Sequence, residues 1–213
     1  HGSRVEDATT EGSTRTTPTS PTLTPQAILD AAEVVLRRHG PAKTTVVDVA
    51  RALDVSHGSV YRHFPSKAAL RDAVTHRWLD RLTAPLDDVA AGPGTASARL
   101  QAWLQLLAAT KQTMAAEDPE LFETFRQLTM ESREVVARHL HHLAGQLATI
   151  VADGTASGEF ASADPAPTGW AILHATARFH HPALSGEWVD RAELARELAA
   201  VHQLIMRGLL ART

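Results

Sequence analysis

The chain has 213 residues, a formal net charge of −3, twelve histidines and no cysteine. The absence of thiols excludes disulfides and thiolate metal sites, and no apolar run approaches the roughly 18 residues that a membrane span requires. The small negative charge argues against a protein that coats nucleic acid indiscriminately. We expect a soluble, cytoplasmic protein without a secretory signal, long enough to bury a sizeable core.

The charge is unevenly distributed along the chain. Residues 24–80 contain eight Lys/Arg and six Asp/Glu, whereas residues 81–213 contain eleven and fifteen. Only the first of these parts is mildly basic, which suits a short and specific contact with DNA.

Residues 1–23 are rich in Thr, Ser and Pro and lack an aliphatic pattern. Such a segment cannot bury enough apolar surface to offset the entropy of ordering. We predict a flexible tail, whose opening His-Gly-Ser looks like a cloning remnant.

Three short helices are predicted after this tail. The first begins at the cap Thr24 and Pro25 and ends at Gly40-Pro41. The second has Val46, Val49, Ala50 and Leu53 on its inward face and ends at Asp54-Val55. Ser56 is a good cap for the third, in which Val60 and Phe64 face inward. The outward side chains of this third helix are polar: His57, Gly58, Ser59, Tyr61, Arg62 and His63. This spacing is typical of a helix-turn-helix.

The stretch from Ser56 to Leu70 reads S-x-G-x-V-Y-x-H-F-x-x-K-x-x-L. It resembles the signature of the TetR (tetracycline-repressor-like) transcriptional regulators. The resemblance covers about Pro25 to Val74 in detail, and the remainder fits the family only in its length and helical pattern.

The resemblance implies a role for each residue of the motif. His57, Gly58 and Ser59 would lie at base edges, Tyr61 and His63 at or near the DNA backbone, and Lys67 on a phosphate. Arg62 stands where the family often has a bulky residue, and it could reach a guanine or another phosphate. Thr45 is a further phosphate candidate, because a hydroxyl and free N–H groups meet at a helix N-terminus. Val47 lacks the polar group that some relatives use on a base.

The rest of the chain is predicted to be helical as well. After Ser66 we expect a helix that ends before Pro85, and a Gly/Pro linker over Ala91–Thr95. Further helices are predicted over Ala96–Ala116, Pro119–Leu128, Ser132–Asp153, Pro167–His181 and Asp190–Arg212. The fold class is therefore all-α, with a three-helix DNA-binding domain (residues 24–70) followed by a larger helical domain for ligand binding and dimerisation (residues 71–213).

Apolar and aromatic residues of the second domain are by default plain core. The resemblance implies a mostly apolar ligand cavity there. The candidates for its apolar lining are Trp103, Leu107, Met114, Phe122, Phe125, Met130, Trp170 and Phe179. The candidates for its polar groups are Gln127, Thr129, His139, His142, His174 and Arg178. Arg178 would favour an anionic ligand if it points inward.

Two alternatives from other classes remain open. The histidines near positions 139–142, 174–181 and 202 could form a metal sensor or a metal-dependent enzyme, although their spacing lacks a helical zinc motif. A helical adaptor that binds only protein is the other. No nucleophile elbow, phosphate loop or Rossmann glycine pattern is present, so we expect no enzyme, no cofactor and no metal.

The leading hypothesis is a homodimeric, ligand-responsive repressor. A single recognition helix covers too few base pairs to be selective, so we expect two, related by a two-fold axis, on a near-palindromic operator. By resemblance, the last two helices, from Pro167 and Asp190, form the dimer surface. A small-molecule effector would release the DNA.

Overall fold

The computed structural model describes residues 23–161 and 164–210. Within these residues all regular structure is helical, apart from one isolated β-bridge between Phe160 and Leu210. The prediction of an all-α fold is confirmed, whereas the predicted flexible tail falls outside the described residues except for Leu23. None of the helices described here combines the length and the hydropathy needed to cross a bilayer.

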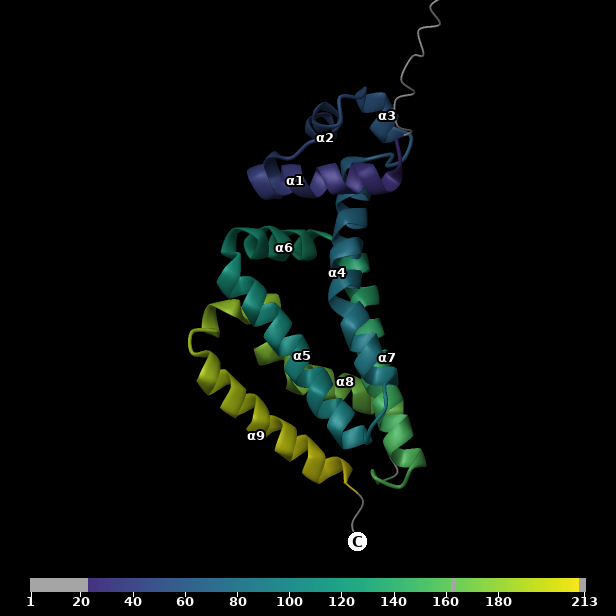
Figure 1. Ribbon diagram of the computed structural model, residues 1–213, viewed down its shortest axis with the longest axis vertical. Coiled ribbons are helices and arrows are strands. Elements are labelled where there is room, and N and C mark those ends of the chain that lie inside the picture. Colours follow the sequence, from purple (N-terminus) through teal and green to yellow (C-terminus); the bar gives the residue numbers. More distant parts are fainter. Residues whose placement is uncertain (1–22, 162–163, 211–213) are drawn as a thin grey trace, which may run out of the picture.

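Nine α-helices and two 3₁₀ turns follow one another along the described part of the chain (Figure 1). Their bounds are α1 Pro25–Lys43, α2 Val46–Ala52, α3 His57–Tyr61, α4 Lys67–Ala91, α5 Ala96–Glu117, α6 Pro119–Glu131, α7 Arg133–Ala156, α8 Pro165–Ala175, η1 Ala177–Phe179, η2 Pro182–Glu187 and α9 Arg191–Leu209.

The first three helices form a small unit at one end of the molecule (Figure 1). Side-chain caps begin its helices: Thr24 accepts the N–H of Ala27, Thr45 that of Asp48, and Ser56 that of Ser59. Each such cap stabilises a helix start by about 1 kcal/mol. The core of the unit contains the fully buried residues Ile28, Ala32, Val49 and Val60, together with Leu70 and Val74 from α4.

The prediction that the helix from Ser66 ends before Pro85 is wrong. Helix α4 continues through Pro85 to Ala91, over 25 residues. Leu86 and Ala90, one and five residues beyond Pro85, are buried in the core of the second unit. The free energy gained by burying these side chains exceeds the cost of the backbone hydrogen bond that Pro85 cannot donate.

Other predicted bounds shift by smaller amounts. Gly40 interrupts α1 with φ 72°, and one further turn follows it. Helix α3 ends at Tyr61, so Phe64 lies beyond it but still packs against the same core. The predicted helix to His181 stops at Ala175; the 3₁₀ turn η1 lies within its remaining part, and η2 follows from Pro182.

Helices α4 to α9 build the larger unit around a core that includes Trp103, Leu147 and Ile150, all fully buried. Helix α8 lies against α7 at very close range, because Gly169 has no side chain. A Cβ atom at this position would lie 2.5 Å from the carbonyl oxygen of Ala144.

Helix α6 belongs to both units. Leu128 is fully buried in the core of the first unit, while Phe125, one turn away, is buried with Leu79 and Val135 in a separate cluster. In Figure 1, α6 lies between α1 and the remaining helices. Together with α4 it connects the two ends of the molecule.

Candidate DNA-binding surface and ligand cavity

Helix α3 presents its predicted polar side chains on the outside of the first unit. His57, Gly58, Arg62 and His63 are exposed, and Tyr61 keeps 42% of its surface accessible. The rings of His57 and Tyr61 meet edge to face with centroids 6.4 Å apart. The buried Val60 anchors this helix to the core, so its polar side chains face outward.

Two of these side chains are held in place by hydrogen bonds. The Arg62 guanidinium donates from Nη2 to Ser59 Oγ at 3.1 Å, and Ser59 Oγ lies 2.9 Å from Ser56 Oγ. Among the residues that the structure describes, the other guanidinium N–H groups of Arg62 have no partner, so they could bind a phosphate or a guanine.

Lys67 is exposed in the first turn of α4, whose N-cap is Ser66. A cation is unfavourable at a helix N-terminus unless an anion joins both. This placement therefore suits the predicted phosphate contact of Lys67.

Thr45 is exposed, but its polar groups are already used. Its hydroxyl donates to Asp48 Oδ2 at 2.6 Å, and its backbone N–H donates to the same oxygen at 2.9 Å. The hydrogen bonds from Thr45 hold the pKa of Asp48 below its usual value. The carboxylate beside Thr45 would repel a phosphate, so the structure gives this residue mainly a capping role.

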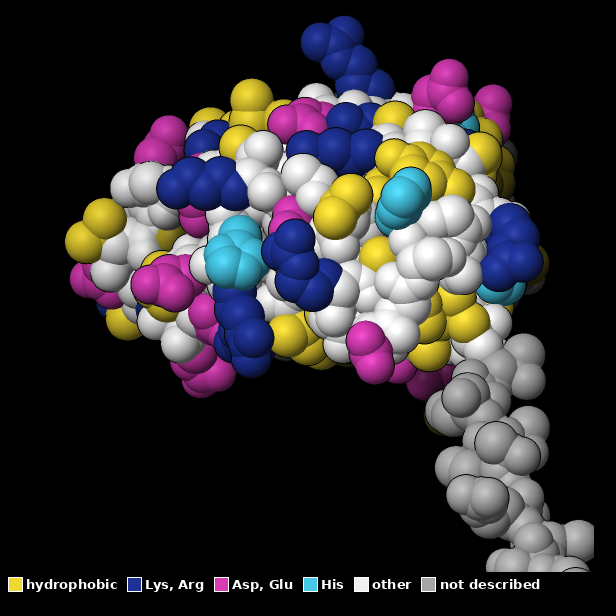
Figure 2. All heavy atoms as spheres, turned by 90° about the horizontal axis from the view of Figure 1, so that it is seen from above, with side chains coloured by type: hydrophobic (Ala, Val, Ile, Leu, Met, Phe, Trp, Pro, Cys, Tyr) yellow, Lys and Arg dark blue, Asp and Glu magenta, His cyan; other side chains and the backbone are white. Residues whose placement is uncertain are grey.

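Figure 2 shows this end of the molecule from above. Lys, Arg and His side chains lie across the middle of the face, and Asp and Glu are more frequent towards its margin. The mildly basic character of residues 24–80 is thus displayed on the face that carries α3.

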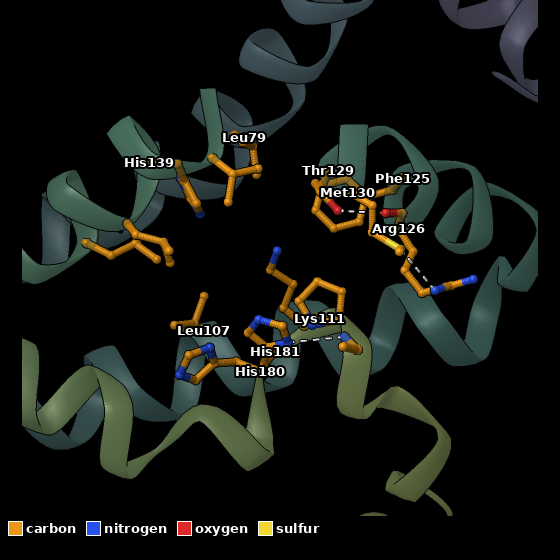
Figure 3. Close-up of a pocket in the computed structure, with 15 residues that line it drawn as sticks. Leu79, Leu107, Lys111, Phe125, Arg126, Thr129, Met130, His139, His180 and His181 are labelled. Carbon is orange, nitrogen blue, oxygen red and sulfur yellow. Dashed lines mark hydrogen bonds between the residues drawn. The ribbon is translucent and has the colours of Figure 1, made fainter. Parts of the chain in front are cut away.

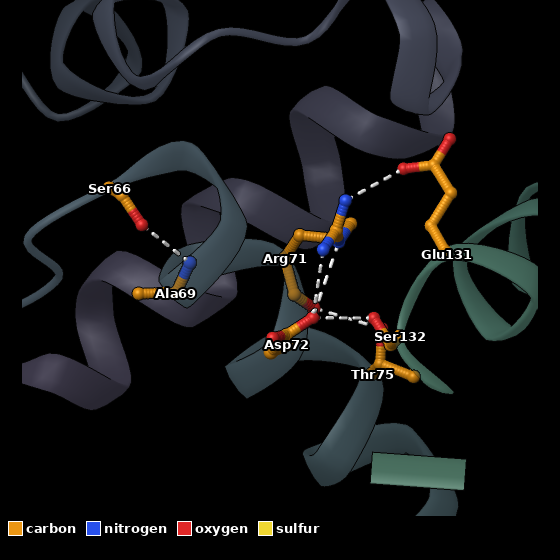
Figure 4. A network of polar contacts seen from close by, with 7 residues as sticks. All are labelled: Ser66, Ala69, Arg71, Asp72, Thr75, Glu131 and Ser132. Carbon is orange, nitrogen blue, oxygen red and sulfur yellow. Dashed lines mark hydrogen bonds and ion pairs between the residues drawn. The ribbon is translucent and has the colours of Figure 1, made fainter. Parts of the chain in front are cut away.

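A polar network joins α4 to the junction between α6 and α7 (Figure 4). Arg71 Nη1 donates to Glu131 Oε2 at 3.0 Å, and its Nη2 lies 3.2 Å from Asp72 Oδ1. The buried Ser132 donates to the same Asp72 oxygen at 2.7 Å. The network ties the first turns of α4 to the end of α6.

Ion pairs also hold α1 against its neighbours. Arg77 on α4 pairs with Asp30 at 2.8 Å and with Glu33 at 2.7 Å. Arg37 on α1 pairs with Asp118, which begins α6. The orientation of the first unit is therefore set by contacts from both α4 and α6.

A cavity of about 240 Å³ lies in the larger unit, directly below α6 (Figure 3). Its lining comes from α4, α5, α6, α7 and the segment before and within η2. Of the predicted ligand residues, Leu107, Phe125, Thr129, Met130 and His139 line it. These residues are separated widely in sequence, and the fold brings them together.

Other predicted ligand residues belong to the core or to a neighbouring hollow. Trp103 is fully buried and donates its indole N–H to Gln146 Oε1 at 2.9 Å. Phe122 and Phe179 are buried in the packing of the unit. Met114 lines a separate hollow beside Trp78.

The remaining predicted polar groups point elsewhere. Gln127 donates to Glu123 at 2.8 Å, and His142 lies 2.8 Å from Asp87. Trp170 packs edge to face against His141 and at a tilt against His174, on α7 and α8. Arg178 is exposed and forms ion pairs with Glu187 at 2.6 Å and with Glu197 at 3.0 Å. Its guanidinium is thereby held at the surface and does not line the cavity.

Sequence reasoning missed the most unusual residue of the cavity, which is Lys111. Its side chain is 4% exposed and extends from α5 into the cavity (Figure 3). Burial lowers the pKa of Lys111 to about 7. Leu104, Leu107 and Lys111 are spaced by three and four residues. This spacing places the lysine on the apolar face of α5, which is the signal that could have revealed it.

Two histidines of the cavity are held neutral. Burial, with a smaller contribution from the charge of Lys111, lowers the pKa of His139 to about 3 and that of His180 to about 4. His139 Nδ1 lies 3.2 Å from the hydroxyl of Thr83, which itself donates to the Leu79 carbonyl. His139 must then donate from Nδ1, and its Nε2 carries a lone pair.

These shifts predict a loss of stability in acid. The unfolded chain binds more protons than the folded chain below about pH 6.5, so stability is complete above that pH and falls as the pH drops towards 4. Each histidine contributes about 1.4 kcal/mol per pH unit in this window. Urea unfolding at pH 7, 6 and 5 should show a shallower decline for His139→Leu than for the unaltered protein. Equal declines would contradict the assignment.

Within residues 23–161 and 164–210, no three His, Cys, Asp or Glu side chains are grouped closely enough to hold a metal ion. The histidines of the metal alternative are spread over α7, α8, the segment around η1 and α9.

Comparison with known families accounts for both units. The family model described as "Bacterial regulatory proteins, tetR family" matches residues 28–74, and "Tetracyclin repressor-like, C-terminal domain" matches residues 96–202. The chain belongs to the TetR family. This family consists of transcriptional regulators, so the expectation of a regulator and not an enzyme is confirmed.

Curated relatives of this TetR-family protein match about a third of the chain. TtgR of Pseudomonas putida is 37% identical over 68 residues, covering 29% of this chain and 32% of that protein. The repressor KstR2 of Rhodococcus jostii is 33% identical over 75 residues, covering 35% and 37%. The matched segments thus span about a third of these relatives.

Solved structures resemble nearly the whole TetR-family chain. SmeT, the repressor of a multidrug efflux pump of Stenotrophomonas maltophilia, aligns with a TM-score of 0.64 and 20% identity, over 89% of this chain and 92% of SmeT. The fatty acid degradation regulator FadR of Bacillus halodurans aligns with a TM-score of 0.61 and 18% identity, over 89% and 97%. At these identities the likeness concerns the fold alone.

Proposed function

We propose that this TetR-family protein is a ligand-responsive repressor that acts in the cytoplasm. It binds a near-palindromic DNA operator as a homodimer and leaves it when a small, mostly apolar effector binds. The observation that carries this proposal is the exposed polar face of α3 on the first unit of a chain whose second unit holds a mostly apolar cavity. KstR2 and SmeT are both named as repressors, and SmeT is also known in complex with triclosan.

The proposed route from cavity to DNA runs through α4 and α6. Leu79 on α4 and Phe125 on α6 line the cavity, while Val74 and Leu128 on the same helices are buried in the core of the first unit. A ligand that displaces either helix therefore changes the orientation of α3. It shifts the equilibrium only as far as it binds the two orientations with different affinity.

The proposed dimer forms through α8 and α9, as a four-helix bundle with the partner copy. Leu204 on α9 is 70% exposed, and small side chains at Ala192, Ala199 and Ala200 are exposed on the same helix. Two recognition helices placed about 34–36 Å apart would then enter successive major grooves.

Operator binding should depend on Lys67 and Tyr61. Lys67→Ala removes one phosphate contact, so we expect roughly tenfold weaker binding to every sequence and a salt dependence reduced by about one counterion. Tyr61→Ala should weaken binding by a similar factor. The measurement is a gel shift on a duplex selected from a random library, at several salt concentrations.

Arg138→Ala is the control for these variants. Arg138 is exposed on α7 in the second unit, so its loss removes the same charge without touching α3. Unchanged binding by both test variants, or equal weakening by Arg138→Ala, would contradict the proposed surface. Sedimentation of the free protein as a single subunit would contradict the dimer.

A further inference from the structure

The inference below rests on the proposed function and names the chemistry of the effector. We propose that the effector is a small apolar monocarboxylate whose carboxylate binds Lys111 Nζ. Its apolar body would fill the space between Leu79, Leu107, Phe125 and Leu143.

Lys111 carries an ammonium group that has no anionic partner in the described part of the structure. Within the described residues its ammonium makes no hydrogen bond or ion pair, and it lies 4.4 Å from the centroid of the Phe125 ring. A buried ammonium without a partner is costly, and a contact with an aromatic face offsets only part of that cost. In Figure 3 the nitrogen of Lys111 points into the cavity, where a ligand could supply the missing anion.

The other residues that line the cavity leave an anion to Lys111. Among the described residues that line the cavity there is no Asp or Glu. Arg126 also lines it, but Glu123 already binds this guanidinium through two contacts of 2.7 Å. Among the described residues, Lys111 is thus the cation of the cavity lining that has no acidic partner and can bind an anionic ligand.

The neutral histidines of the cavity do not compete with Lys111 for an anion. His139 is neutral and carries its free lone pair on Nε2, so it cannot donate to a carboxylate from that atom. His181 Nδ1 accepts the backbone N–H of Ala183 at 3.2 Å, which places the proton of the neutral ring on Nε2. His181 can therefore donate a second hydrogen bond beside Lys111.

The size of the cavity limits the ligand. About 240 Å³ lies just below the range of roughly 300–1,000 Å³ that is common for small-molecule sites. One aromatic ring with a short substituent, or a short branched chain, would fill this space. Long acyl chains would not fit without a movement of α6 or η2.

The test compares acids with their neutral amides on the full chain. Benzoate, 4-isopropylbenzoate, phenylacetate and hexanoate are each paired with the corresponding amide, and dissociation constants are measured by calorimetry. We expect at least one acid of the panel to bind tenfold or more tightly than its amide. Lys111→Met should remove this preference and leave the binding of the amide unchanged.

Lys43→Met is the matched control, because Lys43 is exposed at the end of α1. It should keep the full preference for the acid. Equal binding of acid and amide, no binding by any acid, or an unchanged preference in Lys111→Met would overturn the inference.

A gel shift with the same preparations separates this inference from the proposed function. Operator binding that persists while every acid fails would leave the repressor proposal standing and overturn the carboxylate. Tight binding of an acid through Lys111, in a protein that ignores every duplex, would support the site and contradict the repressor.

Discussion

Leu128→Ala should lower the free energy of unfolding by about 2–5 kcal/mol and should also weaken operator binding up to tenfold. Leu128 is a residue of α6 that is fully buried in the core of the first unit. Its truncation leaves a cavity at the contact between α1 and α6, and the lost methyl contacts account for the loss of stability. The weaker binding follows because the recognition helix is held less firmly in its orientation.

Leu147→Ala provides the matched control. Leu147 is also fully buried, but it lies on α7 in the core of the second unit and does not line the cavity. Urea unfolding should show a similar loss of stability for both variants. Gel shifts at a temperature where both remain folded should show weaker DNA binding only for Leu128→Ala. Equal affinities in the two variants would refute a role for α6 in orienting α3.

Lys111→Met should make the protein more stable, by about 2–4 kcal/mol at neutral pH. Burial lowers the pKa of Lys111 from 10.5 to about 7, and each unit of such a shift corresponds to about 1.4 kcal/mol. Methionine has a similar length and no charge, so it removes the desolvation cost and keeps the packing. The cost of the buried lysine accords with the proposed role of Lys111 in binding an anion.

The stability difference between Lys111→Met and the unaltered protein should decrease as the pH rises. Between about pH 7 and pH 10.5 the unfolded chain binds a proton that the folded chain has released. The unaltered protein therefore gains stability across this window, and the advantage of Lys111→Met is largest below pH 7 and shrinks towards pH 10.5. Urea unfolding at pH 7, 8 and 9 measures the difference, with the exposed Lys43→Met expected to change stability by less than about 0.5 kcal/mol. A destabilised Lys111→Met would contradict the argument.

The first unit could be predicted closely because its signals are local. Caps at Thr24, Thr45 and Ser56, and the apolar spacing that buries Val60, act within a few residues, and the structure shows each of them. The end of α4 could not be predicted in this way. Pro85 is a local signal against a helix, and the packing of Leu86 that overrides it comes from residues distant in sequence.

The cavity was predictable only in part, for a related reason. Helical periodicity assigns Leu107 and Phe125 to an inward face, but it does not tell a cavity wall from solid core. Trp103 has the same pattern but is fully buried in the core, where Gln146 accepts its indole N–H. Arg178 was the expected partner of an anion, and two glutamates from η2 and α9 bind it instead. Such pairings depend on the tertiary fold and leave no mark in one stretch of sequence.

The continuity of α4 has a geometrical consequence for the proposed switch. A helix of 25 residues is about 37 Å long at 1.5 Å per residue, and no loop divides it between the two units. If a rigid rod of this length pivots by about 5° about one end, its other end moves by about 3 Å. In a two-fold symmetric pair the displacements are opposite, so the spacing of the tips would change by about 6 Å. In the proposed dimer, a tilt of a few degrees in α4 would thus be enough to move the two recognition helices out of step with the pitch of the double helix.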